Sequence, residues 1–370
     1  MFLWISITSI GTFLLILIYL LIGIIQHKPK FSDQDSFISV IVCAHNEQDT
    51  IINCLDALLS QTYAQDKTEI IVVNDRSTDN TGDVISEYIH RHPNLKIISI
   101  NDKIEGLSPK KYALSQGIAV AKGNIILTTD ADCIPPKNWI KIITSYFTKE
   151  TGMVVGMAPL ASTSWWLSSF ISMDALTADI LAYGSLGWGH AVACAGRNFA
   201  YRKSVFMEVN GFSGINHIIT GDDDLFLQKV AKMTNWKIQF SPELESSVPS
   251  NAPSGWAHFI AQRKRHISGA KYFSLPIQLG YALYFFSKLF IMVTFIILLT
   301  NNIGFYIPSL LFLLSYFPAA IFISVMARKT NQIYLIIYYP LWEIYYLLSH
   351  IFLGPLGLFG KISWGKRHFE

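Results

Sequence analysis

Two aspartates one residue apart, Asp130 and Asp132, come directly after the apolar run at residues 124–129. Carboxylates this close repel each other, and burying them is costly unless something offsets their charge. Either a cation neutralises the pair, or the two side chains form an ordinary acidic turn in water. The first alternative predicts a metal site, because carboxylates are ligands of Mg²⁺ and Mn²⁺.

The segments before this pair predict where it lies. Apolar runs at 37–43, 68–75, 95–100 and 124–129 have the length of strands, and segments with helical patterns separate them. The runs are apolar throughout rather than alternating. We therefore expect an α/β fold, with a mostly parallel sheet covered by helices on both faces.

Polar residues gather where three of these predicted strands end. In parallel sheets ligands bind beyond the carboxyl ends of the strands. The chain has no GxGxxG after its first strand and no GxxxxGK[ST], so a phosphate-binding glycine loop is missing. A bound nucleotide would instead need a metal held by carboxylates. The strand-end residues are His45, Asn46, Glu47, Asn74, Asp75, Asp130 and Asp132.

Composition indicates membrane segments. The 370 residues are 51% hydrophobic and 15% charged, whereas about 25% is usual for a soluble domain. The net charge of +3 is too small to indicate a nucleic-acid partner. The four cysteines show no metal-binding spacing, and we expect them to be reduced.

The N-terminal run at 2–25 carries no charge and is long enough to span a bilayer. It lacks the basic start and the cleavage site of a signal peptide, so we expect an anchor. His27, Lys28 and Lys30 follow it, which places that end in the cytoplasm. We expect an anchor at 1–30 and a cytoplasmic domain at 31–274.

The C-terminal part, 275–360, is expected to form membrane helices, followed by a basic tail at 361–370. Two runs, 275–300 and 303–326, predict a hairpin of spans. The stretch 332–360 contains Pro340, Glu343 and His350, and is either a third crossing or a re-entrant or interfacial segment. The apolar stretch 160–193 is interrupted by Asp174 and Asp179, and we expect it to pack in the core rather than to span.

Five motifs in order resemble the family 2 glycosyltransferases of the GT-A fold, in a branch with membrane anchors. They run from about residue 37 to 270: SVIVCAHNE, VVNDRSTDNT with PKKYAL, TTDADC, AGRNFAYRKSVFMEVNGF with TGDDDLFLQ, and QRKRHISG. The resemblance implies a Rossmann-like sheet, a nucleotide-sugar donor and a divalent metal, Mg²⁺ or Mn²⁺.

The resemblance also implies roles for the strand-end residues. Asp75 matches the residue that contacts the uracil of the donor, and Glu47 a residue near base or ribose. Lys110 matches a lysine near the nucleotide, while we expect its neighbour Lys111 at the surface. In the DxD pair Asp132 is expected to hold the metal, and Asp130 to reach ribose or metal.

The triplet Asp222, Asp223 and Asp224 matches the acidic motif T-E-D-x-D-L, with Gly221 in place of its glutamate. An inverting transfer needs a carboxylate that takes the proton of the acceptor hydroxyl, and adjacent aspartates raise one another's pKa values. The resemblance favours Asp222 as base and Asp223 as the second choice. Asp224 is expected to orient a neighbour or cap a helix.

Gln262 and Arg265 match the first and fourth residues of the QxxRW motif, and at this spacing they share a helix face. The arginine would hold the departing diphosphate. His266 replaces the tryptophan that binds acceptor sugar in polymer synthases. A plainer reading is a basic helix on the membrane, with Arg263 and Lys264 facing headgroups. Arg197 and Asn198 either contact the acceptor or the diphosphate, or have no role in binding them.

Together these observations predict a membrane-anchored, inverting glycosyltransferase. We expect a UDP-sugar donor, with a guanosine donor as the second choice, and a hydroxyl of a lipid or lipid-linked acceptor. The alternatives are a processive polysaccharide synthase and a catalytically weak scaffold that binds nucleotide sugar. The sugar, the acceptor and the oligomeric state do not follow from the sequence.

Overall fold

The structure is a computed structural model that describes residues 1–33, 35–102, 105–300, 306–360, 362–364 and 367–369. These residues form two compact units. The sheet unit comprises 27–161 and 186–251, and the helical unit comprises 1–26, 162–185 and 252–370. The predicted domain at 31–274 is therefore divided, because its segments 162–185 and 252–274 belong to the helical unit. Parts of the predicted tail at 361–370 lie outside the described residues.

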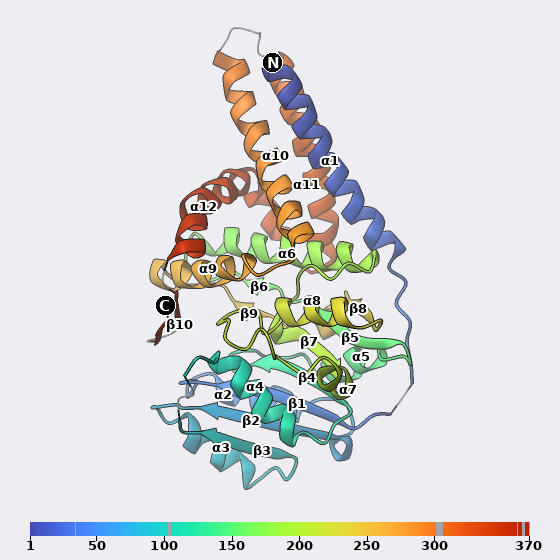
Figure 1. The fold of residues 1–370 in the computed structure, drawn as a ribbon, viewed down its shortest axis with the longest axis vertical. Coiled ribbons are helices and arrows are strands. Elements are labelled where there is room, and N and C mark those ends of the chain that lie inside the picture. The colour runs from blue at the N-terminus through green and yellow to red at the C-terminus, as the bar shows by residue number, and fades with distance from the viewer. Residues whose placement is uncertain (34, 103–104, 301–305, 361, 365–366, 370) are drawn as a thin grey trace. The chain divides into compact units, whose positions relative to one another are not determined.

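The sheet unit is built on a seven-stranded sheet with the order β3-β2-β1-β4-β7-β5-β8 (Figure 1). Neighbouring strands run parallel except β7, which is antiparallel to both β4 and β5. The expected mostly parallel α/β fold is therefore confirmed. The strands are β1 (Ile38–Ala44), β2 (Thr68–Asp75), β3 (Leu95–Ile100), β4 (Ile125–Asp130), β5 (Thr151–Gly156), β7 (Phe199–Arg202) and β8 (Lys237–Ser241).

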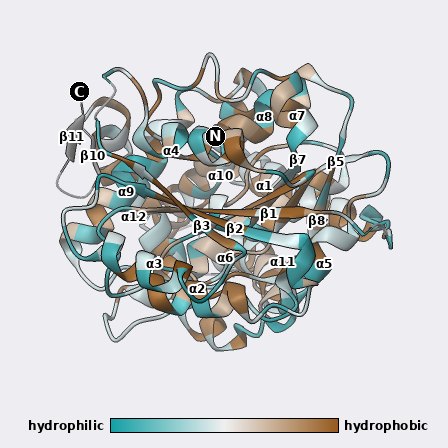
Figure 2. Ribbon diagram, turned by 90° about the horizontal axis from the view of Figure 1, so that it is seen from below, coloured by the Kyte–Doolittle hydropathy of each residue, from teal (hydrophilic) through white to brown (hydrophobic). Residues whose placement is uncertain are grey.

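Helices cover both faces of this sheet because the apolar strands must be buried on both sides. Val40 and Val42 of β1 lie in a core with Leu55 and Trp139, whereas Ile41 lies against Gly117 on the other face. The strands are hydrophobic over most of their length and the surrounding helices are mixed (Figure 2). The helices are α2 (Ile51–Leu59), α3 (Thr81–Ile89), α4 (Pro109–Val120), α5 (Trp139–Ser145), α7 (Lys203–Glu208) and α8 (Asp224–Met233).

Smaller elements complete the sheet unit. Strands β6 (Leu160–Ala161) and β9 (Ser250–Asn251) form a short parallel pair apart from the main sheet. The single turns of 3₁₀ helix are η1 (Gln65–Lys67), η2 (Gly196–Asn198) and η3 (Leu244–Ser246).

The helical unit contains α1 (Phe2–Gln26), α6 (Ser168–Gly187), α9 (Trp256–Ala270), α10 (Leu275–Thr300), α11 (Tyr306–Lys329), η4 (Ile333–Tyr338) and α12 (Tyr339–Phe359). Among the described residues, α1, α10 and α11 are the helices long and apolar enough to cross a membrane. Helix α6 is not among them, which agrees with the expectation for 160–193. Two short strands, β10 (Ile362–Trp364) and β11 (Arg367–Phe369), pair antiparallel near the C-terminus.

Within the helical unit, α1, α10 and α11 pack along one another, and α6, α9 and α12 run across them (Figure 1). Gly184 of α6 lies against the backbone of Leu20 in α1, where a Cβ atom would come within 2.8 Å of the Leu20 carbonyl oxygen. A residue without a side chain therefore permits this close crossing.

Candidate functional site

The carboxyl ends of β1, β2 and β4 bring the predicted strand-end residues to one edge of the sheet. The strands are in register there: Ala44 pairs with Asn74, and Cys43 pairs with Asp130. Side chains that leave these three strand ends therefore meet at one edge, as parallel pairing requires.

Hydrogen bonds connect the loops after β1 and β2, and each loop contains a residue in the left-handed backbone conformation. Asn46 and Arg76 have φ angles of 59° and 55°. Such angles are uncommon outside glycine and gather at functional sites. The Asn46 side-chain oxygen accepts a hydrogen bond from the Thr78 amide at 2.8 Å, and His45 Nδ1 lies 2.7 Å from the Asp75 carbonyl oxygen.

Asp75 is buried at 5% exposure and pairs with Arg76, whose Nη2 lies 2.5 Å from its carboxylate. Sequence reasoning did not single out Arg76, because no pattern distinguishes it from an ordinary residue of a turn. Glu47 accepts a hydrogen bond from the Thr50 hydroxyl at 2.6 Å. Burial raises the pKa of Glu47, and Asp132 and Asp130 raise it further.

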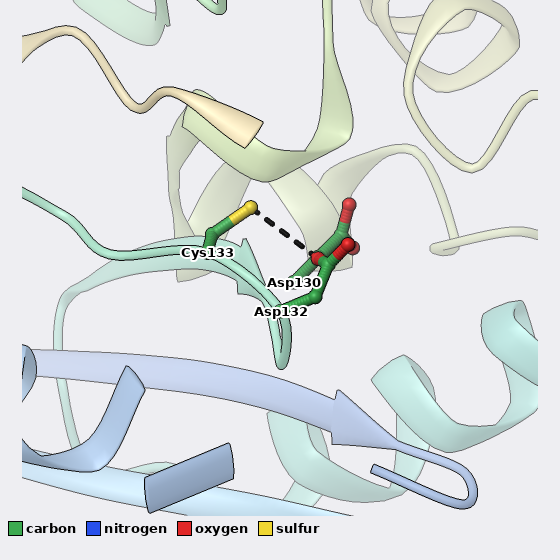
Figure 3. Close-up of side chains that lie close together, drawn as sticks. All are labelled: Asp130, Asp132 and Cys133. Atoms are coloured by element: carbon green, nitrogen blue, oxygen red, sulfur yellow. Dashed lines mark hydrogen bonds between the residues drawn. The ribbon is translucent and has the colours of Figure 1, made fainter. Parts of the chain in front are cut away.

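Asp130, Asp132 and Cys133 form a compact group of potential metal ligands after β4 (Figure 3). One ligand atom from each residue lies within 4.8 Å of the others, and Asp132 is exposed. Burial raises the pKa of the Cys133 thiol, which disfavours the thiolate form that a metal ligand needs. The two carboxylates suit Mg²⁺ or Mn²⁺, with phosphate oxygens and water completing the shell.

Lys110 joins the aspartate pair to the acidic triplet. Its Nζ lies 2.9 Å from Asp130 and 3.1 Å from Asp222, and a small cavity is lined by all three. Burial opposes the charge of Lys110, but Asp130, Asp222 and Asp223 outweigh it and hold the pKa of the lysine well above its usual range. The three side chains come from β4, α4 and the segment before α8.

The three aspartates of the triplet have different partners. Asp223 caps α8: one carboxylate oxygen accepts from the Asp224 amide at 2.7 Å and the other from the Gly196 amide at 2.9 Å. Asp224 accepts from the Cys194 amide at 2.7 Å. Burial raises the pKa of both carboxyls. Asp222, at 13% side-chain exposure, instead faces Lys110 and the cavity.

The chain turn before the triplet depends on Lys111 and Gly221. The Lys111 ammonium donates to the carbonyls of Ile218 and Thr220, each at 2.5 Å, and the residue is 1% exposed. The expectation of a surface position for Lys111 was wrong. Gly221 has a φ of +75°, and a Cβ placed on it would lie 2.5 Å from Leu225 Cγ. The glutamate of the family motif does not fit this conformation.

Two other residues considered for the site support backbone instead. Arg197 donates to the carbonyls of Val248 and Ala158. Asn198 is fully buried and binds Trp139 Nε1 and the carbonyls of Met157 and Ser246. These hydrogen bonds hold the backbone around η2.

Gln262 and Arg265 lie on α9, which belongs to the helical unit. They are one helical turn apart and share a face, as the spacing predicted. Arg263 does not face lipid headgroups. Its side chain is 14% exposed and pairs with Asp174 of α6, so the interpretation as a surface cation was wrong.

Comparisons with known proteins agree with this geometry. The model of a family described as Glycosyl transferase family 2 matches residues 39–210, and that of Glycosyl transferase family group 2 matches 125–349. The second match covers more than half of the chain. The chain therefore belongs to the family 2 glycosyltransferases.

The individual relatives are only distantly similar to this chain in sequence. "Probable glycosyltransferase YdaM" of Bacillus subtilis is 28% identical over 239 residues, which are 64% of this chain and 55% of the relative. "Beta-monoglucosyldiacylglycerol synthase" of Synechocystis is 30% identical over 114 residues, which are 31% of this chain and 23% of the relative. The chain thus spans about half or less of the relatives' lengths.

A solved structure shares the fold over nearly the whole chain. The mannosyltransferase PcManGT from Pyrobaculum calidifontis, in complex with GDP-Man and Mn²⁺, superposes with a TM-score of 0.62 at 18% identity. The match covers 93% of this chain and 99% of that one. The likeness confirms the GT-A fold.

Proposed function

We propose that this protein transfers a sugar, with inversion, from a UDP-sugar to a hydroxyl of a lipid or lipid-linked acceptor at the cytoplasmic face of a membrane. One observation carries the proposal. Lys110 lies within 3.1 Å of both Asp130 and Asp222, so the acidic motif of the C-terminal half stands beside the aspartate pair that ends β4.

Asp132 and Asp130 would hold the divalent metal. The exposed carboxylate of Asp132 is the direct ligand, while Asp130, which also pairs with Lys110, reaches ribose or metal. A divalent metal held by these residues would offset the charge of the donor diphosphate. The Mn²⁺ in the Pyrobaculum mannosyltransferase supports a divalent metal in this fold.

Asp222 is the general base, since both oxygens of Asp223 already accept backbone hydrogen bonds. Asp222 takes the acceptor proton as the hydroxyl oxygen attacks the sugar C1 and the bond from C1 to the diphosphate breaks. Lys110 lies beside both Asp222 and Asp130 and contributes positive charge between the base and the phosphates.

The remaining residues bind the donor. Asp75 would contact the uracil and Glu47 would lie near base or ribose, both in segments held by hydrogen bonds from His45 to the Asp75 carbonyl and from the Glu47 amide to Thr81 of α3. Arg265 would pair with the departing diphosphate, with Gln262 beside it on the same face of α9.

A lipid acceptor is favoured by the helices in the same chain. Among the residues that the structure describes, three helices could cross a membrane, and such an anchor would keep the enzyme where lipid hydroxyls are concentrated. The name of the Synechocystis relative, a diacylglycerol glycoside synthase, points to the same class of acceptor.

The test uses purified full-length protein with UDP-sugars, Mg²⁺ or Mn²⁺ and vesicles of membrane lipid. We expect metal-dependent release of UDP, and a loss of about 10²- to 10⁴-fold in Asp222→Asn, the usual contribution of a general base. Asp132→Ala should lose activity and metal dependence together. Asp83→Asn, an exposed aspartate on α3, is the matched control and should keep full activity. Release of UDP at equal rates in wild type and Asp222→Asn would contradict the proposal.

A further inference from the structure

A cluster of polar side chains is buried among the helices of the helical unit. Asp174 of α6 pairs with Arg263 of α9 and accepts hydrogen bonds from Trp342 Nε1 at 2.7 Å and the Tyr345 hydroxyl at 3.1 Å. Tyr345 also accepts from Arg263 Nη2 at 3.2 Å. Asp174 therefore connects α6 with both α9 and α12.

A second buried pair adjoins this cluster. Lys288 of α10 lies 2.5 Å from the Glu343 carboxylate, and the Tyr339 hydroxyl donates to the same carboxylate at 2.5 Å. The side chains of Lys288 and Glu343 are 4% and 15% exposed. Lys288 Nζ also lies 4.8 Å from the ring centroid of Trp342, so this tryptophan contacts both charged pairs.

Packing alone does not account for these charges. A buried ion pair is often no more stabilising than apolar residues of the same volume, because both ions must leave water. Its directional bonds, however, hold helices in one register. Of these residues, Lys288 lies in a helix that could cross a membrane, where ionisable groups are rare and mark functional sites by default.

The helix that Asp174 holds is the one that carries the predicted leaving-group residues. At 3.6 residues per turn, Arg263 points about 160° away from Arg265 and about 100° away from Gln262. Arg263 can therefore be held by Asp174 while Gln262 and Arg265 point to another face of α9. The ion pair and hydrogen bonds among Asp174, Arg263 and Tyr345 therefore set the rotation of α9 about its axis.

We propose that Asp174 and Tyr345 are positioning residues that hold α9 in the rotation needed by Arg265, and that Trp342 and the Lys288–Glu343 pair tie this arrangement to α10. The inference rests on the proposed function, in which Arg265 pairs with the departing diphosphate. It adds that bonds within the helical unit set the orientation of the residue that stabilises the leaving group.

Tyr345→Phe tests this with the smallest change, because it removes a hydroxyl and keeps the ring. Tyr346→Phe is the matched control, since it removes the neighbouring hydroxyl, which takes no part in the bonds to Asp174, and keeps the ring near Lys288. We expect Tyr345→Phe to lower kcat about fivefold, the size of one net hydrogen bond, with KM for the donor unchanged. Tyr346→Phe should change neither.

A double-mutant cycle separates positioning from general loss of structure. In an Arg265→Lys background, Tyr345→Phe should lower kcat by less than about twofold, because residues that act through one another are not additive. Equal factors in both backgrounds would overturn the proposal.

A second readout does not depend on turnover. In full-length protein in detergent, Tyr345→Phe and Asp174→Asn should speed amide hydrogen exchange in 256–270, while Tyr346→Phe leaves it unchanged. Unchanged exchange in this helix would overturn the inference. If wild type transfers no sugar, the proposed function fails, and exchange still decides whether the network holds α9.

Discussion

Lys110 and Lys111 are neighbours in sequence, but their ammonium groups have different partners. Lys110 lies between two carboxylates, and Lys111 donates to two backbone carbonyls beneath the acidic triplet. The sequence predicted Lys110 at the site from its motif. It could not predict the burial of Lys111, because the carbonyls that accept its protons come from a segment more than 100 residues away.

The pH dependence of stability tests the burial of Lys111. Burial lowers the pKa of Lys111 to about 8, whereas a lysine in an unfolded chain has a pKa of about 10.4. Between these values the unfolded state binds more protons, so the wild-type fold gains stability from this residue as pH rises from about 8 to about 10.

The measurement compares apparent Tm of wild type and Lys111→Met from pH 7 to 10. The difference should shift in favour of wild type across this range. A difference that stays constant would contradict a buried ammonium. Lys122→Met, an exposed lysine just after α4, is the control and should show no such trend.

The roles of the three aspartates in the acidic triplet can be distinguished only from the structure. A run of three aspartates predicts that the three carboxylates repel one another, but it does not predict which of them can take part in the reaction. Asp223 is used by two backbone amides and Asp224 by one, which leaves Asp222 facing Lys110. Gly221, with φ of +75°, turns the chain so that the three aspartates can have different partners.

At the scale of elements, the sequence predicted the N-terminal half of the sheet well. The runs at 68–75 and 95–100 coincide with β2 and β3. Strand β2 is buried over most of its length, as a uniformly apolar strand should be, whereas β3 at the edge of the sheet is half-buried. Strands β5, β7 and β8 were not assigned. They have four to six residues each, and runs this short are not distinguished from other buried segments by periodicity.

Helix α12 was the element that the sequence left open. It begins at Tyr339 and holds Pro340, Glu343 and Pro355, and its Glu343 pairs with Lys288 of α10. It runs across α10 and α11 rather than along them (Figure 1). We therefore expect an interfacial or re-entrant helix, which leaves the C-terminus on the same side of the membrane as the residues that precede α10.

Cysteine labelling in sealed vesicles tests this topology. In a variant without the four native cysteines, a cysteine after Glu370 should react from the same side as one at the exposed Asp83. A cysteine at Tyr306, the exposed first residue of α11, should react from the opposite side. Reaction of the C-terminal cysteine together with the one at Tyr306 would show that α12 crosses the membrane.

At the scale of the whole molecule, one chain combines a GT-A fold with helices that could cross a membrane. The sequence predicted this combination because apolar runs and acidic strand ends have separate signatures. It could not predict that 162–185 would join the helical unit, because α6 has a helical sequence with no membrane-length apolar run. Asp174 within α6 gains its partners only from α9 and α12.

The most direct test of the central claim is mass spectrometry of lipids from vesicles that contain wild type or Asp222→Asn, supplied with a panel of UDP-sugars and divalent metal. Our account predicts a lipid that gains one sugar in wild type alone. A ladder of many added sugars would indicate a polysaccharide synthase. Identical lipids in the two samples with every donor, from folded protein, would contradict the claim that this protein glycosylates lipid.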